Sequence, residues 1–166
     1  ILNDFEKCFN SVFKKELHRQ PDKRNDVVGL VCNSSYIIQF LKHIGISIGK
    51  SDTQIVPWCI LQSPKEYVIE YLKAYFEGDG WINERDGDIG CSTASEKMAK
   101  QIHILLANFG IIVKKFSKLG RATNGNNIYR LYHNVSINGS NVDLFFDNIG
   151  FISERKNSGY TKKNRN

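Results

Sequence analysis

The chain has 166 residues, with 23 Lys and Arg against 17 Asp and Glu, which gives a formal net charge of +6 at pH 7. Hydrophobic residues make up 41% of the chain and charged residues 24%, a balance typical of globular proteins rather than of disordered chains. No apolar run is long enough to span a membrane, so we expect no membrane partner. The excess of basic residues favours a polyanionic partner.

Four cysteines, Cys8, Cys32, Cys59 and Cys91, are scattered through the sequence, and none belongs to a CxxC pair. This spacing argues against a zinc site. It predicts reduced thiols and therefore an intracellular, reducing compartment, without deciding between cytoplasm, nucleoid and organelle.

The most informative predicted element is a helix that ends near residue 80. Residues 63–66 read Ser-Pro-Lys-Glu, which predicts a capping box with proline at the first helical position. Ala74 and Gly78 are small residues four positions apart, so they let a second helix approach closely. Asp79 follows at the helix end, where it could meet an acid from that partner, and two such carboxylates would bind a hard divalent cation. The alternative is an ordinary core helix that ends in a glycine turn.

The elements that follow predict an α+β unit with antiparallel strands. Residues 81–93 read as a hairpin that turns at Asp86 and Gly87. Apolar residues at helical spacing predict a helix over about 95–108 with Gly110 as its stop signal. Residues 113–136 read as two strands around a loop at 123–126, and a short helix is expected over about 141–148.

The chain also contains an internal repeat. Residues 40–46 match residues 145–151 at an offset of 105 (145 − 40), and the pairs 8–9 and 14–15 match the pairs 108–109 and 114–115 at an offset of 100 (108 − 8). These matches predict a partial first repeat over 1–50 without its acid helix, a linker over 51–62, a complete second repeat over 63–160, and a basic tail over 161–166. The missing acid helix would come from an upstream segment, another chain or a symmetric copy.

Residues 72–80, Leu-Lys-Ala-Tyr-Phe-Glu-Gly-Asp-Gly, resemble the nine-residue motif of the LAGLIDADG homing endonucleases. The link over residues 51–57 and the Cys-Ser-Thr-Ala-Ser run at 91–95 are similar to the intein-associated branch of that family. The resemblance implies a saddle of αββαββα units whose antiparallel sheets straddle double-stranded DNA, with two acid helices at a pseudo-twofold axis. It further implies Mg²⁺-dependent cleavage of both strands at a long, specific site.

Two departures from the family pattern limit what the resemblance implies. The first acid helix is missing from the repeat, so the expected second carboxylate has no counterpart in the sequence. The residues that perform protein splicing are also missing, because residue 1 is Ile and residues 163–166 lack a His-Asn pair. We therefore expect no protein splicing from this chain.

The candidate catalytic residues follow from the motif and from the repeat. Asp79 is expected to bind the metal ion, and the resemblance implies that the backbone carbonyl of Gly78 is a second ligand. Lys50 and Lys156 follow the last helix of each repeat, where family enzymes often place a basic residue near the scissile phosphates. The alternative for both lysines is an exposed charge without a catalytic role.

Candidate DNA-binding residues lie on the predicted strands, where alternation puts every second side chain on one face. Arginine and asparagine can read base edges, and lysines can hold phosphates; the alternative is a solvated sheet face. The candidates are Trp81, Asn83 and Arg85 in the hairpin, Ser92, then Lys115, Ser117 and Arg121 with their partners Arg130, Tyr132 and Asn134, and Arg19, Lys23 and Arg24 in a basic loop of the first repeat.

Three functions remain open on the sequence alone. The first is a site-specific double-strand DNA endonuclease or a large fragment of one. The second is a non-catalytic nucleic-acid-binding protein of the same fold, such as an RNA maturase or a regulator. The third is a structural homodimer that pairs through the small-residue face of the acid helix.

Overall fold

The computed structural model describes residues 2–21, 28–120, 129–158 and 160, and the chain divides into two compact units. Unit 1 comprises residues 1–43 and unit 2 comprises residues 44–166. All four cysteines are free thiols. Within the described ranges, no helix combines the length and the apolar character that a membrane span requires.

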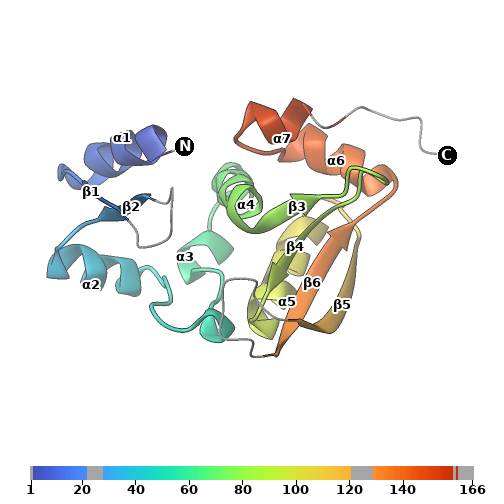
Figure 1. The fold of residues 1–166 in the computed structure, drawn as a ribbon, viewed down its shortest axis with the longest axis horizontal. Helices are drawn as coiled ribbons and strands as arrows, with labels where there is room; N and C mark the ends of the chain where they lie inside the picture. Colours follow the sequence, from blue (N-terminus) through green and yellow to red (C-terminus); the bar gives the residue numbers. More distant parts are fainter. Residues whose placement is uncertain (1, 22–27, 121–128, 159, 161–166) are drawn as a thin grey trace. The chain divides into compact units, whose positions relative to one another are not determined.

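Unit 1 is a small helix–hairpin–helix arrangement (Figure 1). Helix α1 (Leu2–Phe13) is followed by the antiparallel strands β1 (His18–Pro21) and β2 (Val28–Val31) and by helix α2 (Ser35–His43). Phe9 and Phe13 on α1 have ring centroids 4.8 Å apart, and Phe13 meets Phe40 of α2 edge-on at 5.8 Å. Neither helix contains a buried residue, so this unit does not enclose a core of its own.

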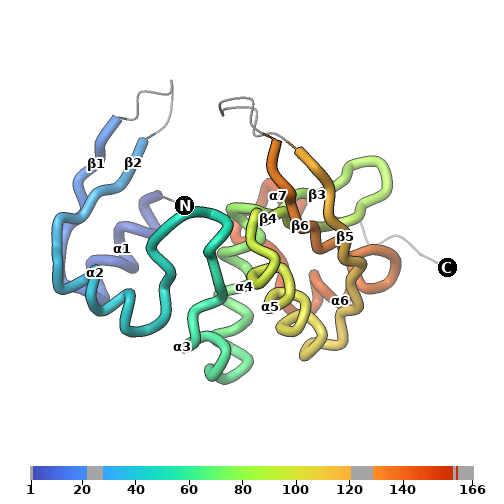
Figure 2. Tube along the Cα trace, turned by 90° about the horizontal axis from the view of Figure 1, so that it is seen from below, coloured from blue at the N-terminus to red at the C-terminus, as the bar shows by residue number. Residues whose placement is uncertain are grey.

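Unit 2 contains a four-stranded antiparallel sheet in the order β3-β4-β6-β5. Figure 1 and Figure 2 show its strands side by side, with helices gathered against the sheet. The elements are, in chain order, the 3-10 helix η1 (Ser51–Thr53), α3 (Trp58–Leu61), α4 (Lys65–Asp79), β3 (Gly80–Ile82), β4 (Ile89–Thr93), α5 (Glu96–Ala107), β5 (Val113–Gly120), β6 (Arg130–Ile137), α6 (Ser140–Asn148) and α7 (Glu154–Ser158).

One face of this sheet carries the hydrophobic core. Cys91 of β4 stands opposite Val135 of β6, and Ile89 stands opposite Ile137, so these four buried side chains share one face. They form one cluster with buried residues of three helices, namely Leu72 and Phe76 of α4, Ile102 and Leu106 of α5, and Phe145 of α6. The predicted α+β architecture is confirmed, and the opposite face of the sheet is left for polar and aromatic side chains.

The helix bounds support the repeat at the offset of 105 positions but not at the offset of 100. Helix α6 has the bounds of α2 displaced by 105 positions (140 − 35 and 148 − 43). The match at 100 positions is not a structural equivalence, because it pairs Phe13, the end of α1, with Val113, the start of β5. Helices α1 and α5 instead have matching bounds at an offset of 94 (96 − 2 and 107 − 13).

The capping box predicted for the acid helix is wrong. The N-cap of α4 is Pro64, which has no side-chain hydrogen bond to the helix. The Ser63 hydroxyl instead donates to the carbonyl of Cys59 at 2.7 Å, because α3 precedes α4 closely and presents that acceptor.

The residues predicted as a linker belong to unit 2, since the boundary between the units falls after His43 rather than after Lys50. The Ser95 hydroxyl donates to the carbonyl of Gln54 at 2.6 Å, and the amide of Val56 donates to the side chain of Gln101 at 2.9 Å. The Val56 side chain is fully buried. These contacts fix residues 51–57 beside the N-terminus of α5.

Candidate active site and nucleic-acid interface

Asp79 is the last residue of α4 and opens onto a hollow in unit 2. Tyr71 and Tyr75 precede it at intervals of four residues, so the three side chains follow one side of the helix. They line a hollow of 540 Å³, which is completed by Ser92 and Thr93 of β4, Tyr132 of β6, Met98 of α5 and the segment around Ser51 and Gln54. The motif acid therefore shares a concave surface with two of the predicted DNA-binding residues, Ser92 and Tyr132.

The electrostatic setting of Asp79 has two opposing components. Desolvation by the surrounding protein raises the pKa of its carboxyl group, whereas the charge of Lys156 lowers it, and desolvation prevails. Burial, and to a lesser degree the charge of Asp79, raises the pKa of Tyr71 to about 12. The Tyr71 hydroxyl donates to the sulfur of Met98 over 3.9 Å, so this donor already has a partner at the hollow.

The side chain of Lys156, a residue of α7, reaches the C-terminal end of α4 and binds backbone carbonyls there. Its Nζ donates to the carbonyls of Phe76 at 2.9 Å, Glu77 at 2.7 Å and Gly80 at 2.8 Å. The sequence predicted this lysine beside the site, and it lies near Asp79, but it contacts backbone carbonyls. An ammonium group has three donors, so all of them are occupied.

Glu77 makes the complementary contact, which the sequence analysis did not identify. Its carboxylate accepts hydrogen bonds from the amides of Ile152 at 3.2 Å and Ser153 at 3.1 Å. Desolvation raises the pKa of Glu77, but the Ser153 hydrogen bonds and the Lys156 charge outweigh it, so the pKa is lowered overall. The partners lie 75 and 76 positions away along the chain, and no local sequence signal marks such a pairing.

The site offers the kind of oxygen ligands that Mg²⁺ prefers, but it offers fewer of them than Mg²⁺ needs. Asp79 offers carboxylate oxygens, and Gly78 offers a carbonyl that is not among the three held by Lys156. Mg²⁺ prefers about six oxygen ligands. Across the described residues, no group of three or more His, Cys, Asp or Glu side chains could hold a metal ion. Further oxygens must therefore come from a second acid, from a phosphate or from water.

The sheet face opposite the core carries several predicted DNA-binding residues. Ser92 stands opposite Asn134, and Tyr132 stands opposite Lys118, so these side chains share a face. Arg130 lies on the same face at the exposed end of β6. Trp81 lies over Gly90, where a Cβ atom would come within 2.3 Å of the indole ring. We call this surface the open face; its residues are Trp81, Ser92, Lys114, Phe116, Lys118, Arg130, Tyr132 and Asn134.

The register places Lys115 and Ser117 on the opposite side, which corrects their assignment to the face of Arg130. Lys115 pairs with Val135, whose side chain is in the core, and Ser117 Oγ lies 2.9 Å from His133 Nδ1. Lys115 lines one hollow with Glu96 and Lys100 of α5, and after the Lys100 hydrogen bond and charge its own charge is a minor cause of the lowered pKa of Glu96. The lysines on the open face are Lys114 and Lys118, which were not predicted because the sequence alone does not fix the pairing of β5 with β6.

The predicted alternation also fails in the hairpin, because β3 ends at Ile82. Asn83 belongs to the turn, where its side-chain amide donates to Asp86 at 3.0 Å and its side-chain oxygen accepts from the Arg85 amide at 3.1 Å. Arg85 is therefore an exposed turn residue rather than part of a strand face. Asn134 is on the open face but only 4% exposed, so its side chain does not reach outward.

The small-residue face of α4 lies on the surface of unit 2. Ala74 and Gly78 are both exposed, and no described atom outside the helix lies within 4 Å of the position that a Gly78 Cβ would occupy. The close helix contact predicted for this face requires a partner helix. Lys50 is the N-cap of η1, directly before Ser51, which lines the hollow, and its carbonyl accepts the Thr53 hydroxyl at 2.9 Å.

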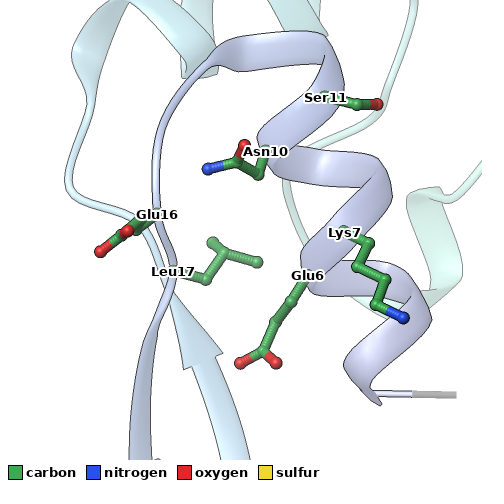
Figure 3. Close-up of a pocket in the computed structure, with 6 residues that line it drawn as sticks. All are labelled: Glu6, Lys7, Asn10, Ser11, Glu16 and Leu17. Carbon is green, nitrogen blue, oxygen red and sulfur yellow. The ribbon is translucent and has the colours of Figure 1, made fainter.

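Unit 1 contains a separate hollow of 430 Å³ between α1 and the segment that leads to β1 (Figure 3). Glu6 lines it and binds Arg19 through Nε at 2.8 Å and Nη2 at 2.6 Å. The predicted DNA-binding residue Arg19 is thus engaged by a carboxylate in this state. Lys23, Arg24 and Arg121 lie outside the described residues.

Residues 66–150 match the LAGLIDADG-like domain, and the chain belongs to the LAGLIDADG homing endonuclease family. The chain is 36% identical over 152 residues to the replication factor C small subunit of Methanocaldococcus jannaschii, a match that covers 91% of the chain and 8% of that protein. It is 34% identical over 147 residues to the DNA polymerase II large subunit of Thermococcus kodakarensis, covering 80% of the chain and 8% of that protein. A third relative, at 28% identity over 158 residues, is a glutamine–fructose-6-phosphate aminotransferase of M. jannaschii, covering 94% of the chain and 14% of that protein. The chain thus spans a small part of each relative.

Proposed function

We propose that the chain is the larger part of a site-specific endonuclease that cleaves both strands of DNA with Mg²⁺. The single observation that carries this proposal is the position of Asp79, which lines the same hollow as Ser92 and Tyr132 of the open face. An acid at the C-terminal end of a helix opposes the helix dipole, so its position favours a ligand-binding role over a stabilising one.

The proposed roles divide between the hollow and the open face. Asp79 and the Gly78 carbonyl would hold the cation, and a bound divalent cation would supply water activation and charge stabilisation. Lys118 binds phosphate, Arg130 reads a base edge, and Trp81 supplies an aromatic contact. A second acid helix, seated on Ala74 and Gly78, supplies the other carboxylate.

The relatives support the proposal that segments similar to this chain occur within longer, mutually unrelated proteins. Their names describe a replication factor, a polymerase subunit and an aminotransferase, yet the similarity to this chain covers only 8–14% of each. A segment shared by proteins with such different names does not perform the activity that any of those names describes. We therefore propose that the chain derives from an inserted, intein-associated nuclease domain.

A non-catalytic nucleic-acid-binding protein is the second candidate, and the contacts of Lys156 favour it in one respect. The lysine expected beside the scissile phosphate has all three donors engaged by backbone carbonyls. A protein that had lost catalysis would keep the open face and bind duplex DNA or folded RNA without cleaving it.

The decisive experiment first selects bound duplexes from a randomised double-stranded DNA pool in Ca²⁺, and then transfers them to Mg²⁺. We expect Mg²⁺-dependent cleavage of the selected duplexes at protein concentrations where two copies of the chain associate and bring two Asp79 carboxylates together. The matched control is Glu66→Gln, which removes an exposed acid from the other end of α4 and should cleave normally. Selective binding without cleavage at any concentration would favour the second candidate, and no selective binding would leave the structural homodimer.

A further inference from the structure

We propose that Glu77 and Lys156 form a reciprocal clamp that fixes the last turn of α4 and thereby positions Asp79. This inference rests on the proposed function for its catalytic consequence, although the clamp itself is a property of the fold. Each side chain binds the backbone of the other's segment: Glu77 accepts from the amides of Ile152 and Ser153, and Lys156 donates to three carbonyls around the end of α4.

The three carbonyls bound by Lys156 lie on both sides of Asp79 in the chain. Phe76 and Glu77 precede it, and Gly80 is the first residue of β3. The last carbonyls of a helix have no partners within the helix, and a cation near them is favoured by the helix dipole. The Phe76 carbonyl also accepts the Gly80 amide, so the Lys156 ammonium adds to this cap and ties the helix end to the strand that follows.

Gly80 shows how closely this junction is packed. A Cβ atom at residue 80 would lie 2.3 Å from the carbonyl oxygen of Phe76, which is itself a Lys156 acceptor. Any side chain at this position would displace that carbonyl. The direction in which the chain leaves Asp79 is thus set by the same backbone groups that Lys156 holds.

The segment that supplies Lys156 is itself held in a defined shape. The Asn157 side chain accepts from the Phe151 amide at 3.0 Å and donates to the Phe151 carbonyl at 2.8 Å, closing residues 151–157 into a loop. The Lys156 ammonium lies 5.1 Å from the centroid of the Phe151 ring, and Phe151 is buried in the core. The clamp therefore connects Asp79 to the core rather than to a free surface loop.

Lys156 is accordingly a positioning residue. To contact a phosphate it would have to release charge-assisted hydrogen bonds to the helix end, which is costly in a partly buried setting. Glu77 gives an independent check on whether the clamp acts by positioning, because an anionic side chain cannot itself stabilise a phosphate. If both residues act by positioning, their removal should affect the reaction in the same way.

Amide hydrogen exchange on the full chain tests the clamp without requiring cleavage. In Lys156→Met we expect exchange at residues 78–82 to become about tenfold faster, with α5 unchanged. Glu77→Gln should accelerate the same amides, and it decides the question if Lys156→Met does not fold. The matched control is Lys100→Met, which removes an exposed lysine paired with Glu96 on α5 and should leave residues 78–82 unchanged.

On a DNA duplex that the chain cleaves, both clamp variants should lower kcat with KM unchanged, because the acid is displaced while the DNA contacts remain. Unchanged exchange at residues 78–82 in both variants overturns the proposal. It is also overturned if Lys156→Met alone loses cleavage while Glu77→Gln cleaves normally, since Lys156 would then act on the DNA directly. A chain that never cleaves would refute the proposed function, and the exchange result would still decide the clamp.

Discussion

Asp79 differs from the other acids of α4 in what surrounds it. Glu66 lies at the favourable end of the helix dipole, Glu70 pairs with Lys73, and Glu77 accepts two backbone amides. Asp79 is an exposed residue at the unfavourable end, beside a hollow, and partial desolvation raises the pKa of its carboxyl group. An acid that opposes the helix dipole beside a hollow is consistent with a role in ligand binding.

The first prediction concerns this carboxylate. In the assembly that cleaves DNA, Asp79→Asn should abolish Mg²⁺-dependent cleavage and leave duplex affinity within several-fold of the parent, because removing a negative charge does not weaken attraction to phosphates. Gel-shift titration and plasmid cleavage measure the two properties. Cleavage retained by the variant would exclude Asp79 as a metal ligand.

A second prediction follows from the strand register. Lys118→Ala should weaken binding to cognate and scrambled duplexes alike and reduce the slope of log affinity against log salt by about one. Lys115→Ala is the matched control on the same strand; its side chain lies on the α5 side of the sheet, so it should have little effect. Equal losses in the two variants would show that the open face is not the DNA-binding surface.

At Arg130 the expected effect is on specificity. Arg130→Ala should reduce discrimination between cognate and scrambled duplexes by about 1–3 kcal/mol, the typical value of a bidentate arginine–guanine contact. Competition binding at fixed salt measures the ratio of the affinities for cognate and scrambled duplexes directly. If cognate and scrambled duplexes lose affinity equally, Arg130 contacts the phosphate backbone.

At the scale of elements, the sequence predicted most of unit 2 correctly. The acid helix, the hairpin, the second helix and the two long strands all lie close to their predicted positions, because apolar periodicity and glycine turns are local signals. The side of the sheet occupied by each lysine was not predictable in this way. A shift of one residue in the pairing of β5 with β6 exchanges Lys115 with Lys114, and only the folded register decides between them.

The clamp at the end of α4 could not be predicted from local sequence either, because its partners are about 75 residues apart. It should make the stability of the fold depend on pH. The pKa of Glu77 is lowered in the folded chain, so its ionised form stabilises the fold. That stability is fully present above the unfolded-state pKa of about 4.3 and is lost as the pH falls through the lower folded value. Glu77→Gln should therefore flatten the acid side of the stability profile.

Urea unfolding between about pH 3 and pH 7 measures this effect, since Glu titrates within that range. The control is Glu66→Gln, which removes a carboxylate without clamp contacts from the same helix and should change the slope less than Glu77→Gln does. An unchanged slope in Glu77→Gln would mean that its carboxylate is not held by the Ile152 and Ser153 amides in solution.

At the scale of the molecule, the two units differ in how well they bury apolar surface. Unit 2 encloses a continuous core, whereas α1 and α2 contain no buried residue and expose Phe5, Tyr36 and Phe40. In unit 2 the equivalent helices pack with an acid helix, α4. Within its described residues, unit 1 has no counterpart of α4. We therefore expect the functional assembly to contain a second acid helix.

The most direct test of this account separates monomer from larger species by sedimentation and measures plasmid linearisation in Mg²⁺ by each fraction. Cleavage of both strands should need two acid helices, so we predict that the monomeric chain does not linearise the plasmid. Linear product should appear only in a species that brings two acid helices together, such as a dimer with two Asp79 carboxylates, and Asp79→Asn should eliminate it. Efficient linearisation by a proven monomer of this chain would contradict the account.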